Sequence, residues 1–222
     1  MSTERFTPAL GYAALMPVYD LAIRLLTRER RWRGMLLEQV SPQDGESVLD
    51  VGCGTGTLAI EIKQAVPGVR VVGMDPDPQI LQRARSKAIA AGVDIEWRRG
   101  FAHDAAEFAG EFDKAVSSLV FHQVPLEEKY AGLAAMWASV RDGGEVHIAD
   151  YCRQPDWPMR QLFRLVQALD GWANTQANAD GVIEDYLGEL SGSAIVPMMV
   201  VRTPTGAISL LKLRKQRGSG VG

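Results

Sequence analysis

Three glycines at alternate positions follow an apolar run in the segment VLDVGCGTG, from Val48 to Gly56. Glycine at Gly52, Gly54 and Gly56 lets the backbone adopt positive φ and approach a ligand closely. We expect a strand to end here and a helix to begin, and open parallel sheets bind ligands outside the carboxyl ends of their strands. The segment therefore predicts a site for a nucleotide-like ligand.

Two carboxylates narrow the class of ligand. Asp75 ends the second predicted strand, where a carboxylate commonly accepts hydrogen bonds from both hydroxyls of an adenosine ribose. Asp50 precedes the glycine loop, where it would repel a pyrophosphate and attract an ammonium group. The spacing is G-x-G-x-G, whereas dinucleotide folds use G-x-G-x-x-G. A ligand with adenosine, a positive charge and no phosphate fits these conditions, and S-adenosylmethionine is such a ligand.

Strands and helices alternate in the elements that must position these residues. Apolar runs predict strands over 47–51, 69–74, 93–97, 114–118 and 145–149, with helices over 20–40, 57–65, 78–91 and 126–140. One or two further helices are expected within 156–190. The last two runs, 194–201 and 207–213, predict a hairpin. The fold class is therefore α/β, with a mostly parallel sheet between helical layers.

The composition is that of a globular domain, with 222 residues, 46% hydrophobic, 23% charged and a net charge of −3. This charge disfavours a strongly basic nucleic-acid binder. No apolar stretch is long enough to span a bilayer, and the first residues carry no apolar signal core. Two cysteines, Cys53 and Cys152, give neither a disulfide framework nor a metal cluster. We expect a cytoplasmic protein without a metal site.

The sequence resembles the class I S-adenosylmethionine-dependent methyltransferases, and within them the small-molecule branch that includes ubiquinone and menaquinone biosynthesis enzymes. Besides the glycine segment, the resemblance is carried by VVGMDPDPQIL (Val71 to Leu81), FDKAVSSLVFHQVP (Phe112 to Pro125) and VRDGGEVHIADY (Val140 to Tyr151). It covers about residues 9–152 by motif and the rest by layout.

The fold that this resemblance implies is a Rossmann-like three-layer sandwich. Its sheet has seven strands, mostly parallel, with an antiparallel C-terminal hairpin. The resemblance also implies one methyltransferase domain over 1–222. Within it, residues 1–40 form an N-terminal cap and residues 153–190 a helical insertion that lines the substrate pocket.

The resemblance also assigns cofactor contacts. Gly52 and Gly54 approach the methionine part of S-adenosylmethionine, Asp50 positions its ammonium group and Asp75 holds the ribose. The further cofactor-binding residues are Cys53, Pro76, Gln79, Phe101, Ala102, Ser117 and Tyr12.

Phe101 departs from the family pattern, because an acidic residue usually stands there and contacts the adenine amino group. Ala102 retains a backbone donor for the adenine edge. His103 and Asp104 are the candidates for the missing partner.

Positioning should matter more than any single catalytic group, because the methyl group of a sulfonium is already activated. Orientation supplies about 7–11 kcal/mol, whereas a general base adds roughly 3–5 kcal/mol. His122, just past the fourth strand, is the candidate base or substrate contact, and Tyr19 is expected to close the site. His147, inside a strand, is expected to be a core histidine.

The acceptor is a small molecule whose specificity should come from residues 1–30 and 153–190. Quinone precursors, phenols, amines and thiols all fit, and the basic stretch Arg28 to Arg33 adds lipid headgroups or a membrane surface. Three alternatives stay open: a nicotinamide oxidoreductase, a non-catalytic protein that binds the same cofactor, and a nucleic-acid methyltransferase. The sequence does not predict an oligomeric state.

Overall fold

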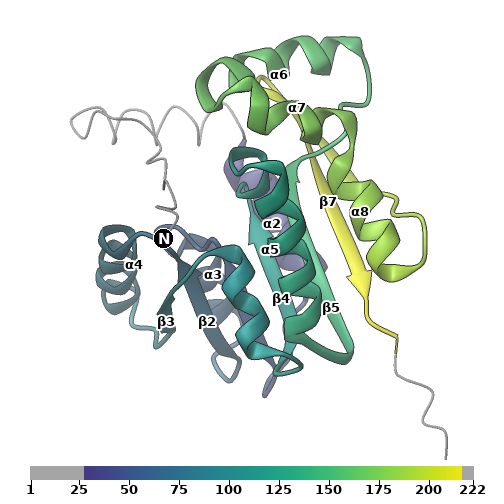
Figure 1. Ribbon diagram of the computed structural model, residues 1–222. Coiled ribbons are helices and arrows are strands. Elements are labelled where there is room, and N and C mark those ends of the chain that lie inside the picture. The colour runs from purple at the N-terminus through teal and green to yellow at the C-terminus, as the bar shows by residue number, and fades with distance from the viewer. Residues whose placement is uncertain (1–27, 217–222) are drawn as a thin grey trace, which may run out of the picture.

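A seven-stranded sheet forms the centre of the molecule in the computed structural model, which describes residues 28–216 (Figure 1). The strand order is β3-β2-β1-β4-β5-β7-β6. The strands are β1 (Ser47–Val51), β2 (Arg70–Asp75), β3 (Glu96–Arg99), β4 (Phe112–Ser118), β5 (Val140–Tyr151), β6 (Met199–Thr203) and β7 (Gly206–Arg214). Strands β1 to β5 pair in parallel, and β7 pairs antiparallel with both β5 and β6. The predicted Rossmann-like architecture with its antiparallel hairpin is confirmed.

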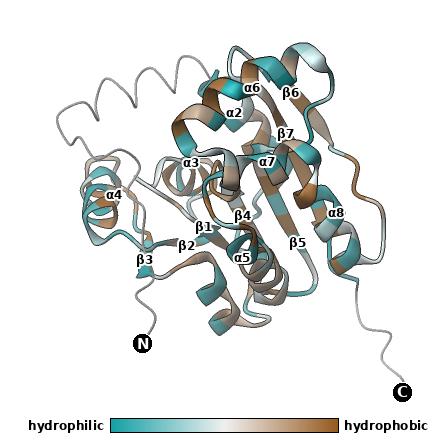
Figure 2. Cartoon of the chain, turned by 45° about the horizontal axis from the view of Figure 1, so that its top comes forward, coloured by the Kyte–Doolittle hydropathy of each residue, from teal (hydrophilic) through white to brown (hydrophobic). Residues whose placement is uncertain are grey.

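Helices cover both faces of the sheet. They are α2 (Glu29–Val40), α3 (Thr57–Ala65), α4 (Pro78–Ala90), α5 (Leu126–Ser139), α6 (Trp157–Asp170), α7 (Trp172–Asp180) and α8 (Val182–Ser191), with two short 3₁₀ turns, η1 (Ala102–Phe108) and η2 (Phe121–Gln123). Alternate strand residues serve two separate cores: Val48 packs in the core shared with α2, α3 and α6, and Leu49 in the core shared with α5 and α8. Figure 2 shows apolar residues on the strands and inward helix faces.

The strand order creates a switch point at the carboxyl ends of β1 and β4. Strands β1 and β4 are neighbours in space although β2 and β3 lie between them in the sequence. The chain therefore reverses direction across the sheet at this point, and such a switch point is where open α/β sheets bind ligands. The loops after β1, β2 and β4 meet there, and Figure 1 shows α6 and α7 beyond the end of β5 on the same side of the molecule.

The structure corrects several of the predicted elements, and β5 begins at Val140 rather than at residue 145. The third strand is Glu96–Arg99 rather than 93–97, because the Val93 amide donates to Ala88 O and completes the end of α4. Strand β6 begins at Met199 rather than at residue 194. Pro197, which has no N–H for a ladder, stands between the two positions.

A further correction concerns 156–190, which holds three helices rather than one or two. Two glycines divide the segment, because Gly171 has φ +91° and Gly181 has φ +100°. These values lie in a region that residues with a Cβ rarely adopt. None of the helices in residues 28–216 is long and apolar enough to cross a membrane.

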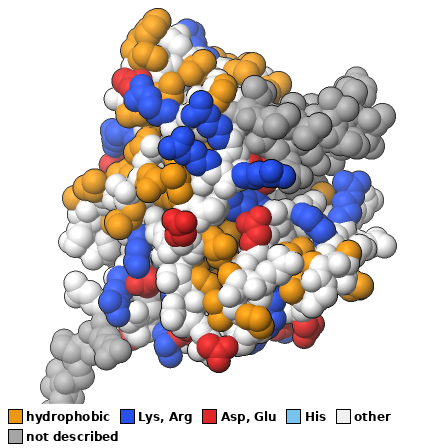
Figure 3. Space-filling model, turned by 180° about the vertical axis from the view of Figure 1, so that it is seen from behind, with side chains coloured by type: hydrophobic (Ala, Val, Ile, Leu, Met, Phe, Trp, Pro, Cys, Tyr) orange, Lys and Arg blue, Asp and Glu red, His pale blue; other side chains and the backbone are white. Residues whose placement is uncertain are grey.

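The basic stretch predicted as a surface lies at the start of α2. Arg33 pairs with Glu29 at 2.6 Å and lies over the Trp32 ring, and Arg28 donates to the backbone carbonyl of Arg202. Figure 3, from behind, shows Lys and Arg side chains interspersed with hydrophobic ones on this side of the molecule. Whether this surface meets a membrane stays a prediction.

Candidate functional site

The glycine loop after β1 is tied to the end of β2 by backbone hydrogen bonds. Gly52 N and Cys53 N both donate to Met74 O, at 2.8 and 2.9 Å, and Gly54 N donates to Asp75 Oδ2 at 3.0 Å. Gly52, Gly54 and Gly56 have φ of +69°, +54° and +73°. The predicted need for glycine at all three positions is therefore confirmed by the backbone.

The three glycines differ in what surrounds them. A Cβ on Gly52 would overlap Val120 in the loop after β4, and one on Gly56 would overlap the Trp97 ring. A Cβ on Gly54 would meet nothing within 4 Å. Two glycines thus let the loop pack against its neighbours, while Gly54 faces open space beside Asp75.

Asp75 is fixed by the backbone around it. Its Oδ2 accepts from Gly54 N and its Oδ1 accepts from Asp77 N, both at 3.0 Å. Burial raises the pKa of this carboxyl, and the two N–H donors oppose that rise. An ionised carboxylate accepts about four hydrogen bonds, so Asp75 retains capacity for about two more.

Asp50 is a buried carboxylate with no side-chain partner. It is 1% exposed, and neither of its oxygens accepts a hydrogen bond of good geometry in the described part of the chain. Burial raises its pKa to about 7, the positive charge of Arg33 opposes that rise, Asp75 adds to it, and the nearby Ala59 amide lowers it slightly. Because an unpaired buried charge is costly, this arrangement fits a site that receives a cationic group.

The other predicted cofactor residues spread around this centre. Cys53 is a buried member of the loop, and burial raises the pKa of its thiol, which therefore stays protonated. Ser117 is fully buried and donates to Val51 O at 2.9 Å, so its hydroxyl joins β4 to β1. Pro76 directly follows Asp75, and Gln79 is exposed on the first turn of α4.

Phe101 and Ala102 lie at the start of η1, after β3. The Phe101 amide donates to Asp104 Oδ2 at 2.8 Å, and the Phe101 ring stacks on His103 with 5.6 Å between centroids. His103 Nδ1 lies 2.9 Å from Glu128. Both candidates for the missing adenine contact thus have partners within the protein.

Two predicted residues, Tyr12 and Tyr19, lie outside the described residues. Their assignment to the cofactor and to site closure stays a prediction. His147 is fully buried between Gln39 and Glu145, at 3.2 Å from each, as a core histidine should be.

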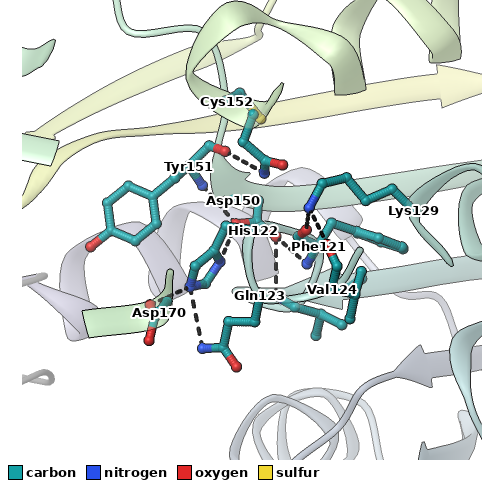
Figure 4. A network of polar contacts seen from close by, with 12 residues as sticks. Phe121, His122, Gln123, Val124, Lys129, Asp150, Tyr151, Cys152 and Asp170 are labelled. Carbon is teal, nitrogen blue, oxygen red and sulfur yellow. Dashed lines mark hydrogen bonds and ion pairs between the residues drawn. The ribbon is translucent and has the colours of Figure 1, made fainter. Parts of the chain in front are cut away.

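His122 lies in η2, where it is 3% exposed and has polar partners on both ring nitrogens (Figure 4). Its Nδ1 is 2.7 Å from Asp150 Oδ1, and its Nε2 is 3.5 Å from Asp170 Oδ2. The side-chain nitrogen of Gln123 lies 3.2 Å from the same Nε2, but a protonated ring only donates there, so Asp170 is its acceptor. Burial lowers the pKa of the imidazole, but the charges of Asp150 and Asp170 outweigh burial and raise it to about 9. A ring with this pKa carries its proton at neutral pH, and the expected role of His122 as base or substrate contact stays a prediction.

Sequence reasoning missed the residues that hold η2 in place. Asp150 Oδ2 accepts from Val120 N at 3.0 Å and Phe121 N at 2.7 Å, and its Oδ1 also accepts from Tyr151 N at 2.7 Å. Lys129 donates to Phe121 O and, at 2.6 Å, to Val124 O; burial lowers the pKa of its ammonium group to about 8. The signal for Asp150 was its place near the carboxyl end of β5.

The sequence of this chain is similar to those of known methyltransferases. A family model described as a methyltransferase domain matches residues 48–144. The chain is 32% identical to a demethylmenaquinone methyltransferase of Deinococcus radiodurans over 69% of this chain and 64% of that protein. It is 28% identical to the protein of that name in Thermus thermophilus, over 69% and 70% of the two chains. The chain thus spans slightly less than two thirds of the Deinococcus protein.

A solved structure shares the fold at lower identity. Magnesium protoporphyrin IX methyltransferase from Synechocystis PCC 6803, crystallised with bound SAH (S-adenosylhomocysteine), superposes with a TM-score of 0.62 at 18% identity. The match covers 90% of this chain and all of that one.

Proposed function

We propose that this chain is a class I S-adenosylmethionine-dependent methyltransferase, which transfers a methyl group from S-adenosylmethionine to a small-molecule acceptor. The family model and the relatives support the reaction class. Among the acceptors that the sequence leaves open, the names of those relatives favour a demethylated quinone precursor.

Asp50 is the observation that carries the proposal. A buried carboxylate with no side-chain partner, next to a glycine loop, suits the ammonium group of the cofactor and would repel a diphosphate. Asp75, fixed by Gly54 N and Asp77 N, has the remaining acceptor capacity for a ribose diol. The residues present therefore fit the group.

The cofactor supplies a methyl group on a sulfonium, which needs no further activation for displacement. The protein's share is to hold and orient. Asp50 and Asp75 would fix the two polar ends of the cofactor, and the Gly52–Gly54 backbone would allow its close approach. The loop after β4, pinned by Asp150, would form the wall beside the methyl group.

His122 would act as a fixed cation rather than as a base. Its ring is protonated below a pH of about 9 and both of its nitrogens already have partners. Acceptors that lose no proton during attack, or lose it beforehand, suit such a site best.

Titration of the protein with cofactor compounds tests the proposal directly. We expect SAH to bind with heat detectable by calorimetry at micromolar protein, because its ammonium and ribose match Asp50 and Asp75. NAD should not bind, because its pyrophosphate would face Asp50. Binding of NAD together with a flat SAH trace would instead support the oxidoreductase alternative.

Replacing Asp75 with alanine should weaken SAH binding by about 10- to 150-fold, which corresponds to the roughly 1.5–3 kcal/mol of hydrogen bonds to a charged group. Calorimetric dissociation constants measure this effect. The matched control is Asp77→Ala, which removes the helix cap at Gln79 N and Ile80 N. That control should cost about 1 kcal/mol of stability with no change in affinity. Equal affinities for the two variants would remove Asp75 from the site.

A further inference from the structure

His122 connects two parts of the molecule that lie far apart in the sequence. Its Nδ1 side is bound to Asp150, which also accepts the backbone amides of Val120, Phe121 and Tyr151. That carboxylate therefore cannot move without breaking three backbone hydrogen bonds. The ring is fixed by it, and its Nε2 points toward the helices that follow β5 (Figure 4).

The partner on that side is Asp170, the last residue of α6. Gly171, with φ +91°, turns the chain sharply into α7. From the first turn of α7, Asn174 donates to Gln123 O at 2.8 Å. The corner between α6 and α7 thus rests on η2 through one charged contact and one neutral hydrogen bond.

This corner is connected to the glycine loop through η2. η2 follows β4, and its neighbour Val120 packs against Gly52 in the glycine loop. A shift of η2 would therefore be felt at the cofactor loop, and a shift of the corner would change the wall on the acceptor side. Only 17% of the Asp170 side chain is exposed, so its attraction to the ring is weakly screened.

We propose that Asp170 is a positioning residue, whose ion pair with His122 fixes the α6–α7 corner against η2 and thereby sets the wall of the acceptor pocket. The inference rests on the proposed function, because only a methyltransferase would have an acceptor pocket at this place. The contact itself is a property of the protein without ligand.

The charges around the ring decide how the pair responds to pH. Asp150 from β5 and Asp170 from α6 are the anions that face it, Lys129 from α5 lies on the far side of Asp150, and the Tyr151 ring packs edge-on at 5.1 Å. With both anions present the pKa of His122 is about 9. Loss of the imidazole proton above that pH removes the attraction, so rising pH should release the corner.

The substitution Asp170→Asn tests the proposal by two readouts that need no acceptor. Hydrogen exchange in residues 157–180 should become at least about tenfold faster, while strands β1 to β4 keep their protection. NMR titration of the three histidines should show the pKa of His122 lowered by about 1 unit. Asp170→Glu, which keeps the charge, should restore the higher pKa.

Asp185→Asn is the matched control, because Asp185 pairs with Arg153 on the surface of α8, with 67% of its side chain exposed. It should leave both readouts unchanged. Unchanged exchange in 157–180, or an unchanged His122 pKa, in Asp170→Asn would overturn the proposal.

The unmodified protein gives a second test in case Asp170→Asn does not fold. Exchange in 157–180, corrected for its intrinsic dependence on pH, should rise as the pH passes about 9. A flat profile would overturn the proposal. Failure of SAH to bind would contradict the proposed function but would not affect the ion pair between Asp170 and His122. The two failures are therefore distinguishable.

Discussion

Replacing Asp50 with asparagine will stabilise the protein without ligand and weaken its binding of SAH. Folding raises the pKa of this carboxyl from 3.8 to about 7, mainly through burial. The folded state therefore holds a proton that the unfolded chain releases, so the contribution of Asp50 to stability is least unfavourable below pH 4 and becomes more unfavourable as the pH rises to about 7. Above that pH the loss amounts to about 4 kcal/mol at about 1.4 kcal/mol per unit.

Urea denaturation at two pH values measures this effect. The asparagine variant has no titrating group at position 50, so its gain in the free energy of unfolding should grow from about 1–2 kcal/mol at pH 5 to about 4 kcal/mol at pH 8. SAH should bind about tenfold or more weakly, because the charged partner of its ammonium group is gone.

The control for this change is Asp44→Asn, which replaces an exposed carboxylate. It should change stability by less than about 0.5 kcal/mol at either pH. A gain in the free energy of unfolding for Asp50→Asn that does not depend on pH, or an unchanged SAH affinity, would show that Asp50 is not the binding site for a cationic group.

The second large effect is expected for Gly52→Ala. The backbone at this position has φ +69°, which costs a residue with a Cβ about 1–2 kcal/mol. The added methyl group would also overlap Val120, which cannot withdraw because its amide is bound to Asp150. Gly52 itself is held by Met74 O at 2.8 Å. Overpacking between two fixed segments adds about 1–3 kcal/mol.

Gly45→Ala separates strain from overlap. Gly45 has φ +79°, but a Cβ there would meet nothing within 4 Å, and it lies before β1, away from the loops after β1, β2 and β4. We expect this control to lose about 1–2 kcal/mol and to keep its SAH affinity. Gly52→Ala should lose about 2–5 kcal/mol and bind SAH measurably less. Equal losses in the two variants would show that the loop after β4 can move.

Much of the cofactor side was predictable because its signals are local. The alternation of strands and helices fixes which residues fall at the carboxyl ends of strands, and this placed Gly52, Gly54 and Asp75 together before any contact was known. Tyr12 and Tyr19 were predicted by resemblance alone and are still predictions.

The acceptor side was less predictable because its properties arise between distant segments. The sequence placed His122 after the fourth strand but could not supply its charge state, which depends on Asp150 and Asp170 from two other elements. Ser117 was assigned to the cofactor, yet its hydroxyl bonds to the neighbouring strand at Val51 O. Neither contact has a periodic or spaced signature in the chain.

The sequence by itself determined the order of the elements, the glycine loop and the two carboxylates beside it, because these follow from backbone freedom and strand ends. Only the tertiary structure decided which carboxylate is satisfied and which imidazole is charged. The physical reason is that hydrogen-bond satisfaction and pKa depend on burial and on through-space distances. In this protein those distances join Asp50 to Arg33, and His122 to Asp170.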